Sequence, residues 1–217
     1  MSSEDIFEVG YVQVDHAVEL SKVVCAFLRD LSHTFLYVYS GQEEELFRVE
    51  TAMNDFTVMV CQDEELAEYI DTTLLSVRRW IQYQRLEGFA VVLVDEEENV
   101  AFSYQINFFK PEVRVKKKIA DFLVYITDLR KKFFEILNTI RYSERPAETN
   151  NQSLRFRILC KLIPETSTVN RPREYAWQKV GATADVEDAL LLPCGTRIDN
   201  PILQADMYGK EHKCTEE

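Results

Sequence analysis

The side chains that could perform acid–base, nucleophilic or metal chemistry are few and scattered along the sequence. The chain has three His and five Cys residues, and none stands at the spacing at which His and Cys side chains share a zinc ion. The acidic runs 43–45 and 96–98 are consecutive glutamates, so their carboxylates diverge and do not form an acid–base pair. No phosphate-binding glycine-rich loop is present. We therefore expect no catalytic residue, no metal site and no cofactor.

The charge balance argues against direct binding to nucleic acid. Asp and Glu number 37 against 25 Lys and Arg, which gives a formal net charge of -12. Such a chain repels a phosphate backbone, and the short basic runs 116–118 and 130–132 are interpreted as solvated faces of a helix.

The cysteines are odd in number and dispersed along the chain, which favours free thiols in a reducing compartment. The acidic start lacks the apolar region of a signal peptide, and no apolar run is long enough to span a bilayer. The expected location is the nucleus or the cytosol, without a membrane association.

Hydrophobic periodicity predicts the elements that must position any site. Apolar residues recur at three- and four-residue steps over 15–39, 63–83 and 115–142, which predicts three long helices, the first with one apolar stripe. Four apolar or alternating runs predict strands at 56–60, 89–94, 100–109 and 154–163. The second and third of these form a hairpin around the charged turn 95–99, and the run 89–94 is apolar enough to be buried on both faces.

The last part of the chain, after Pro164, has no helical periodicity. Short apolar pieces at 175–180, 189–193 and 202–208 are separated by polar and turn-forming residues. The apolar content is too high for plain disorder, and a long irregular segment in a compact domain is usually functional. We expect weak strands and irregular chain that wrap the core or change between two arrangements.

The order of these elements, together with four stretches of sequence, resembles the HORMA-domain family from about Val14 to Tyr208. The stretches lie in the first helix, the second helix, the hairpin and the tail: 23–28 with 36–38, 65–74, 91–97, and Trp177 with 191–193, 202–203 and Tyr208. The resemblance implies an α+β fold in which a central, mostly antiparallel sheet packs on three long helices. It divides the chain into a flexible N-terminus (1–13), a HORMA core (14–163), a C-terminal safety-belt region (164–208) and an acidic tail (209–217).

The resemblance also implies a non-catalytic adaptor that traps a short partner peptide under its C-terminal segment. Tyr69 and Trp177 match the positions that contact the trapped peptide, although the residues alone would also allow Tyr69 to be a core residue of the second helix. Arg130 falls near an arginine of the family's self-association surface, which implies a homodimer or a dimer with another HORMA protein.

Within the family, the tail is most similar to the branch that holds the accessory, non-catalytic subunit of the translesion DNA polymerase zeta. That likeness implies a partner peptide from the polymerase's catalytic subunit, a role in DNA repair and a nuclear location. Leu191, Leu192 and Tyr208 match a surface that docks a second translesion polymerase. The sequence departs from the expected pattern at Asp206, where a charged residue stands in place of the polar residue two positions before the final tyrosine. Two alternatives stay open: a spindle-checkpoint HORMA protein, and a small α/β enzyme without a recognisable motif.

Overall fold

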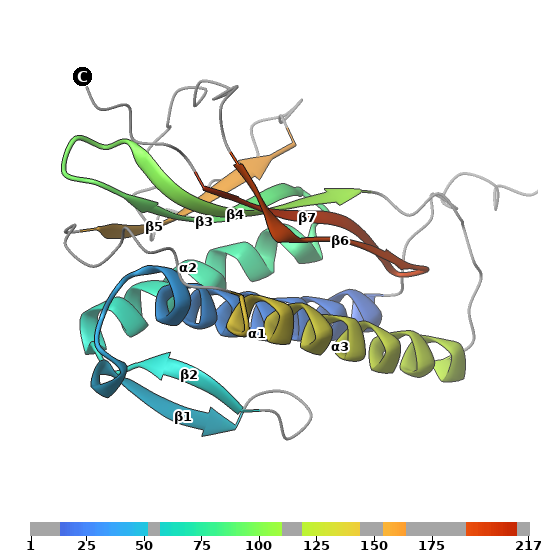
Figure 1. Cartoon of the computed structure of the whole chain (residues 1–217). Coiled ribbons are helices and arrows are strands. Elements are labelled where there is room, and N and C mark those ends of the chain that lie inside the picture. The colour runs from blue at the N-terminus through green and yellow to red at the C-terminus, as the bar shows by residue number, and fades with distance from the viewer. Residues whose placement is uncertain (1–13, 52–56, 110–118, 144–153, 164–189, 212–217) are drawn as a thin grey trace, which may run out of the picture.

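The computed structural model arranges the chain in layers, with three helices against one face of a five-stranded sheet (Figure 1). It describes residues 14–51, 57–109, 119–143, 154–163 and 190–211. Its helices are α1 (Val14–Tyr39), α2 (Glu64–Gln82) and α3 (Ile119–Arg141), with one short 3-10 helix, η1 (Glu44–Leu46). Its strands are β1 (Phe47–Thr51), β2 (Thr57–Cys61), β3 (Leu86–Val94), β4 (Val100–Phe109), β5 (Arg155–Leu162), β6 (Leu190–Asn200) and β7 (Leu203–Glu211). The predicted α+β class, with a mostly antiparallel sheet packed on three long helices, is confirmed.

The centre of the main sheet is the predicted hairpin of β3 and β4. The strand order is β5-β3-β4-β7-β6, and every neighbouring pair is antiparallel. The hairpin turn is closed by hydrogen bonds between Asp95 and Asn99, and Glu98 takes a positive φ of 72°. Four consecutive residues at the end of β3, Val91–Val94, are buried, as expected for a strand covered on both faces.

The C-terminal part of the chain is more regular than the sequence indicated. We expected weak strands and irregular chain after Pro164, but β6 and β7 are strands of 11 and 9 residues that extend the main sheet. In β7 every second residue is buried, and two of the buried positions are Ala205 and Gly209. Because these residues are small, the alternation is hard to recognise in the sequence. Residues 164–189, which include Trp177, lie outside the described part.

Helix α1 is the centre of the helix layer and is buried on more than one face. We expected a single apolar stripe, but polar residues are buried as well, namely Asp30, Ser32, His33 and Thr34, and of these His33 lies on the side opposite the stripe. His33 is covered by the β1–β2 hairpin, which packs on α1 on the side away from the main sheet (Figure 1). The sequence did not predict β1, which has only two large apolar residues, Phe47 and Val49. Gly41, with a φ of 69°, follows the end of α1 as expected.

The other two helices pack against α1. Asp63 begins α2 by accepting a hydrogen bond from the backbone N–H of Leu66, and acidic residues fill the first turn. On α3, Phe133 stacks on Phe27 of α1 with ring centroids 3.9 Å apart. None of the described helices is long and apolar enough to cross a membrane.

Candidate functional site

Strand β5 is one edge of the main sheet, and among the described residues it has a neighbour on one side only. It pairs with β3 without interruption from Lys161 opposite Gly88 to Arg155 opposite Val94. The backbone groups on its other side have no strand to bind in the described part of the chain. An unpaired strand edge is a template on which another strand can add.

The hydroxyl group of Tyr69, on α2, caps this edge. It accepts a hydrogen bond of 3.1 Å from the backbone N–H of Ile158. The backbone groups of successive strand residues point to opposite sides, so those of every second residue point to the same side. The backbone groups of Phe156 and Cys160 therefore face the free edge together with those of Ile158. The Tyr69 side chain is 40% exposed, and its ring meets the Phe156 ring edge-on at 6.3 Å. The alternative interpretation of Tyr69 as a core residue is therefore wrong.

A pocket of about 340 Å³ lies beside the same edge, where α2 and β5 both begin. Nine of the described residues line it, and they are mostly apolar or carboxylate-bearing: Leu36, Ser40, Gln42, Asp63, Glu65, Leu66, Tyr69, Leu154 and Phe156. The apolar members come from α1, α2 and the start of β5. The two carboxylates come from the first turn of α2 and the residue that caps it. The site thus combines a strand edge with a pocket for a side chain.

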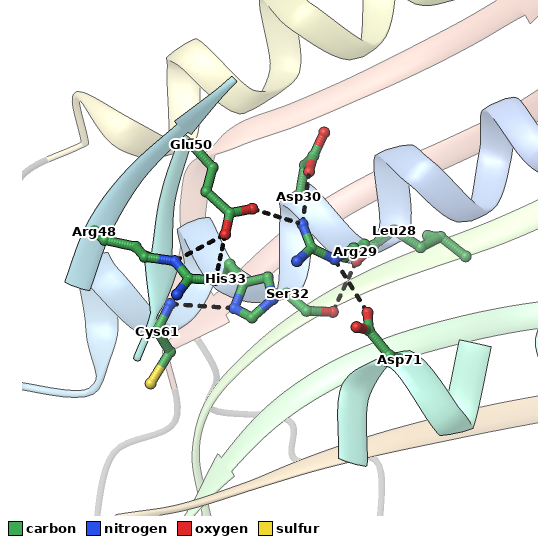
Figure 2. A network of polar contacts seen from close by, with 9 residues as sticks. All are labelled: Leu28, Arg29, Asp30, Ser32, His33, Arg48, Glu50, Cys61 and Asp71. Atoms are coloured by element: carbon green, nitrogen blue, oxygen red, sulfur yellow. Dashed lines mark hydrogen bonds and ion pairs between the residues drawn. The ribbon is translucent and has the colours of Figure 1, made fainter. Parts of the chain in front are cut away.

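An arginine on α1 fixes α2 beside this edge (Figure 2). The guanidinium of Arg29 binds the Asp71 carboxylate of α2 at 3.0 Å and the Glu50 carboxylate of β1 at 3.5 Å. Glu50 is also bound by Arg48, and that hydrogen bond holds the pKa of the Glu50 carboxyl below its usual range. Because Asp71 lies two residues after Tyr69, these ion pairs hold the part of α2 that carries Tyr69.

His33 is a structural residue of the same network (Figure 2). Its side chain is fully buried, and its Nδ1 atom accepts a hydrogen bond of 3.4 Å from the backbone N–H of Cys61 on β2. Its Nε2 atom has no hydrogen-bond partner in the described residues. Burial, with a smaller contribution from Arg29, lowers the pKa of His33 to about 4. The imidazole is therefore neutral near pH 7 and ties α1 to the β1–β2 hairpin.

Cys25, Cys61 and Cys160 do not have the properties of nucleophiles. Burial raises the pKa of the Cys25 thiol to about 12, against a smaller opposite effect of Arg78. Burial also raises the pKa values of Cys61 and Cys160. None of the three is in a disulfide. Within the described ranges there is also no cluster of three or more His, Cys, Asp or Glu side chains that could hold a metal ion.

The basic side chains of β5 lie on the sheet face away from the helices and are already paired. Arg155 and Arg157 both bind the Glu98 carboxylate in the β3–β4 turn, which holds the pKa of Glu98 below its usual range. Lys161 binds Glu87 of β3 at 2.8 Å. These contacts align β5 on β3 and leave the pocket side of β5 without a basic residue.

The other residues singled out from the sequence lie away from this edge. Arg130 is on α3, where its guanidinium approaches Glu19 of α1 at 4.0 Å. Leu191 and Leu192 pair in backbone register with Lys210 and Gly209, next to Tyr208 on β7.

The Tyr208 hydroxyl donates to Gln105 of β4 at 3.0 Å and accepts from Asn107 at 3.1 Å. The three predicted docking residues thus lie near one another on the β6–β7 hairpin, at the edge of the sheet opposite to β5. Trp177 lies outside the described residues, so the structure does not place it beside Tyr69.

Several residues of the site were not singled out from the sequence. Phe156, Ile158 and Leu154 were recognised as parts of a strand, but not as parts of an edge. Asp63 and Glu65 have the ordinary signature of a helix start. Only the strand order, which joins segments far apart in the sequence, makes one site of them.

Comparison with known proteins supports the fold. No family model and no curated protein matches the sequence. Among solved structures, the chain resembles a component of a mitotic checkpoint complex, with 17% identity, a TM-score of 0.65, and coverage of 91% of this chain and 97% of that one.

Two C. elegans proteins are also similar in structure. HTP-2 bound to HTP-3 closure motif 1 has 13% identity and a TM-score of 0.63, with coverage of 88% and 85%. HTP-1 bound to the HIM-3 closure motif has 10% identity and a TM-score of 0.60, with coverage of 86% of each chain. These neighbours are HORMA-domain proteins, so the chain shares the HORMA fold.

Proposed function

We propose that the protein is a non-catalytic adaptor that binds a short, extended segment of a partner protein along the free edge of β5. The observation that carries this proposal is the hydrogen bond from the Ile158 N–H to the Tyr69 hydroxyl, which occupies an edge position that a partner strand's carbonyl would take. Solved structures with the same fold hold closure-motif segments, which supports this mode of binding.

Binding by strand addition would use the backbone for affinity and the pocket for selectivity. The partner's carbonyl and N–H groups would pair with those of Phe156, Ile158 and Cys160. Its alternate side chains would point toward the helices, where Tyr69 and the pocket lie. Tyr69 would give up its bond to Ile158 and pack its ring against the incoming segment, since an aromatic ring offers a large contact area with little rotamer entropy.

The trapping role of the C-terminal segment rests on the family resemblance and on chain connectivity. Residues 164–189 join the end of β5, at one edge of the sheet, to the start of β6, at the other edge. This connection begins beside the site proposed for the partner segment, and it contains Trp177, the second residue proposed to contact the peptide.

For the pathway, we propose translesion DNA synthesis in the nucleus, with the partner segment supplied by the catalytic subunit of the polymerase. The support is the likeness of the tail residues. A second translesion polymerase would dock on Leu191, Leu192 and Tyr208, and Arg130 on α3 would take part in self-association. The second candidate is a spindle-checkpoint adaptor, favoured by the similarity to a chain of a mitotic checkpoint complex.

The test is a pull-down from cell extract with the full chain and a Cys160→Pro variant, read by mass spectrometry. Proline at 160 removes a backbone N–H that faces the free edge and leaves the bonds to β3 in place. Cys160→Val, which keeps that N–H, is the matched control. A partner retained by the wild type and by Cys160→Val, and lost by a folded Cys160→Pro, would support strand addition.

The identity of the retained protein decides the pathway. A translesion polymerase subunit supports the first candidate, and a checkpoint protein supports the second. Equal retention by all three chains would contradict binding at β5. A nucleotide or metal that stays with the purified chain, with no partner protein, would favour the enzyme alternative.

A further inference from the structure

The pocket beside β5 has a chemistry that selects one kind of side chain. Its apolar lining residues Leu36, Leu66 and Phe156 are buried or half-buried and form its floor, whereas the carboxylate-bearing residues Asp63 and Glu65 are exposed and stand at its rim. Among the described residues, no Lys, Arg or His lines it. Glu65 makes no hydrogen bond or ion pair with any other described residue, and Asp63 uses its Oδ1 atom to cap α2. An apolar cavity thus opens toward negative charge that the described residues do not neutralise.

We propose that this pocket receives a lysine or arginine side chain of the partner segment that adds to β5. The proposal rests on the proposed function and specifies one residue of its ligand. The aliphatic stem of such a side chain would cover Leu36, Leu66 and Phe156, and the cation at its end would lie between the Asp63 and Glu65 carboxylates. Long basic side chains commonly bury their stems in this way while the charge stays at the surface.

Other classes of side chain fit the pocket less well. An acidic side chain would be repelled by the two carboxylates. The start of α2 does not attract an anion either, because Asp63 caps it and Glu64 and Glu65 offset its positive dipole. A purely apolar side chain would fill the floor but would take water from the carboxylates without a compensating partner.

The register places this residue near the start of β5. Leu154 and Phe156 line the pocket, whereas Ile158 lies opposite Tyr69. Side chains two residues apart on a strand point to the same face. In the partner segment, the basic residue therefore lies two positions before or two positions after the residue that packs on Tyr69.

The test uses a display library of random peptides long enough to span the eight residues of β5. It is selected on the full wild-type chain and on an Asp63→Asn/Glu65→Gln double variant. Asn at 63 still caps the helix, so this variant removes two charges from the pocket and keeps the start of α2. A Glu64→Gln/Glu68→Gln double variant is the matched control, since it removes two charges from the same helix at residues that do not line the pocket.

We expect one position of the selected peptides to be enriched in Lys and Arg on the wild type and on the control, and not on the Asp63→Asn/Glu65→Gln variant. For one selected peptide, replacing its basic residue by methionine should weaken binding to the wild type about fivefold and leave binding to the pocket variant unchanged. Added salt should reduce the fivefold preference.

The outcomes separate this proposal from the proposed function. Peptides that bind without a preferred basic position, or whose preference persists on the pocket variant, would overturn the lysine or arginine pocket and leave strand addition at β5 intact. If no peptide is selected by any folded chain, both proposals fail. Thermal unfolding of each variant shows whether its loss of preference reflects a loss of fold.

Discussion

The two edges of the main sheet, β5 and β6, have the same backbone groups but differ in their readiness to accept another strand. β6 contains Pro193, which has no N–H to donate, and its pairing with β7 shifts register between Leu192 and Thr196. β5 contains neither proline nor glycine and pairs continuously with β3 from residue 155 to 161.

The environments of the two edges also differ. The far end of β6 is tied to the helix layer, because the Asn200 amide donates to the Tyr125 carbonyl of α3 at 3.0 Å. β5 is flanked by an exposed tyrosine and a pocket. Proline, bulges and covering elements are the devices that proteins use to block a strand edge. In the described part of the chain they occur at β6, whereas β5 has none of them between residues 155 and 161, which indicates that β5 is the edge available to a partner.

The largest predicted effect is a loss of folding stability in acid through His33 of the helix layer. It tests whether β5 and β6 are both held in place by that layer. His33 has a pKa of about 4 in the fold against 6.5 for an ordinary histidine, so the fold favours its neutral form. The stabilisation that this provides is complete above about pH 6.5 and is lost as the pH falls toward 4, up to about 3 kcal/mol. Acid should therefore loosen β5 and β6 together. The His33→Asn variant should lose less stability than the wild type between these pH values, because its amide oxygen can still accept the Cys61 N–H.

Denaturant unfolding of both chains from pH 7 to pH 4 measures this difference. An equally steep loss of stability in His33→Asn would show that other groups cause the acid sensitivity. Opening of one edge at a pH where the other stays protected would contradict a common helix layer.

The next effect concerns Tyr69, where two substitutions should act in opposite directions. Tyr69→Ala removes the ring that packs on Phe156 and on the partner, and should weaken peptide binding about tenfold. Tyr69→Phe keeps the ring but no longer competes for the Ile158 N–H, and should strengthen binding about threefold, with a stability cost of about 1 kcal/mol in the free chain. Titration calorimetry with a selected peptide distinguishes the two; weaker binding by Tyr69→Phe would contradict the capping role.

The smallest effect should appear at β6. Pro193→Val restores a backbone N–H to that strand, and it should leave the affinity for a β5-binding peptide unchanged. It should also increase the tendency of the chain to associate with itself, because one protection of this edge is removed. Sedimentation velocity of wild type and variant measures the association. A loss of peptide affinity in Pro193→Val would show that β6 takes part in the binding that we assign to β5.

The sequence predicted the elements with strong periodicity and not their arrangement. The three helices and the β3–β4 hairpin follow from the spacing of apolar residues within each segment, which is a local property of the sequence. The β6–β7 hairpin was underestimated, since β7 buries Ala205 and Gly209 where a typical strand has large apolar residues. The edge position of β5 depends on pairing between distant segments, so local pattern cannot reveal it. Tyr69 was found through the family resemblance, whereas Asp63 and Glu65 were indistinguishable from an ordinary helix start.

The most direct test of the central claim is amide hydrogen exchange of the full chain, measured by NMR with and without a bound peptide. Strand addition at β5 predicts slower exchange at Ile158 and Cys160, whose N–H groups face the free edge. It predicts little change at Arg157 and Leu159, which already bind β3, and none in β6. Protection that does not alternate along β5, or that appears in β6, would contradict the account.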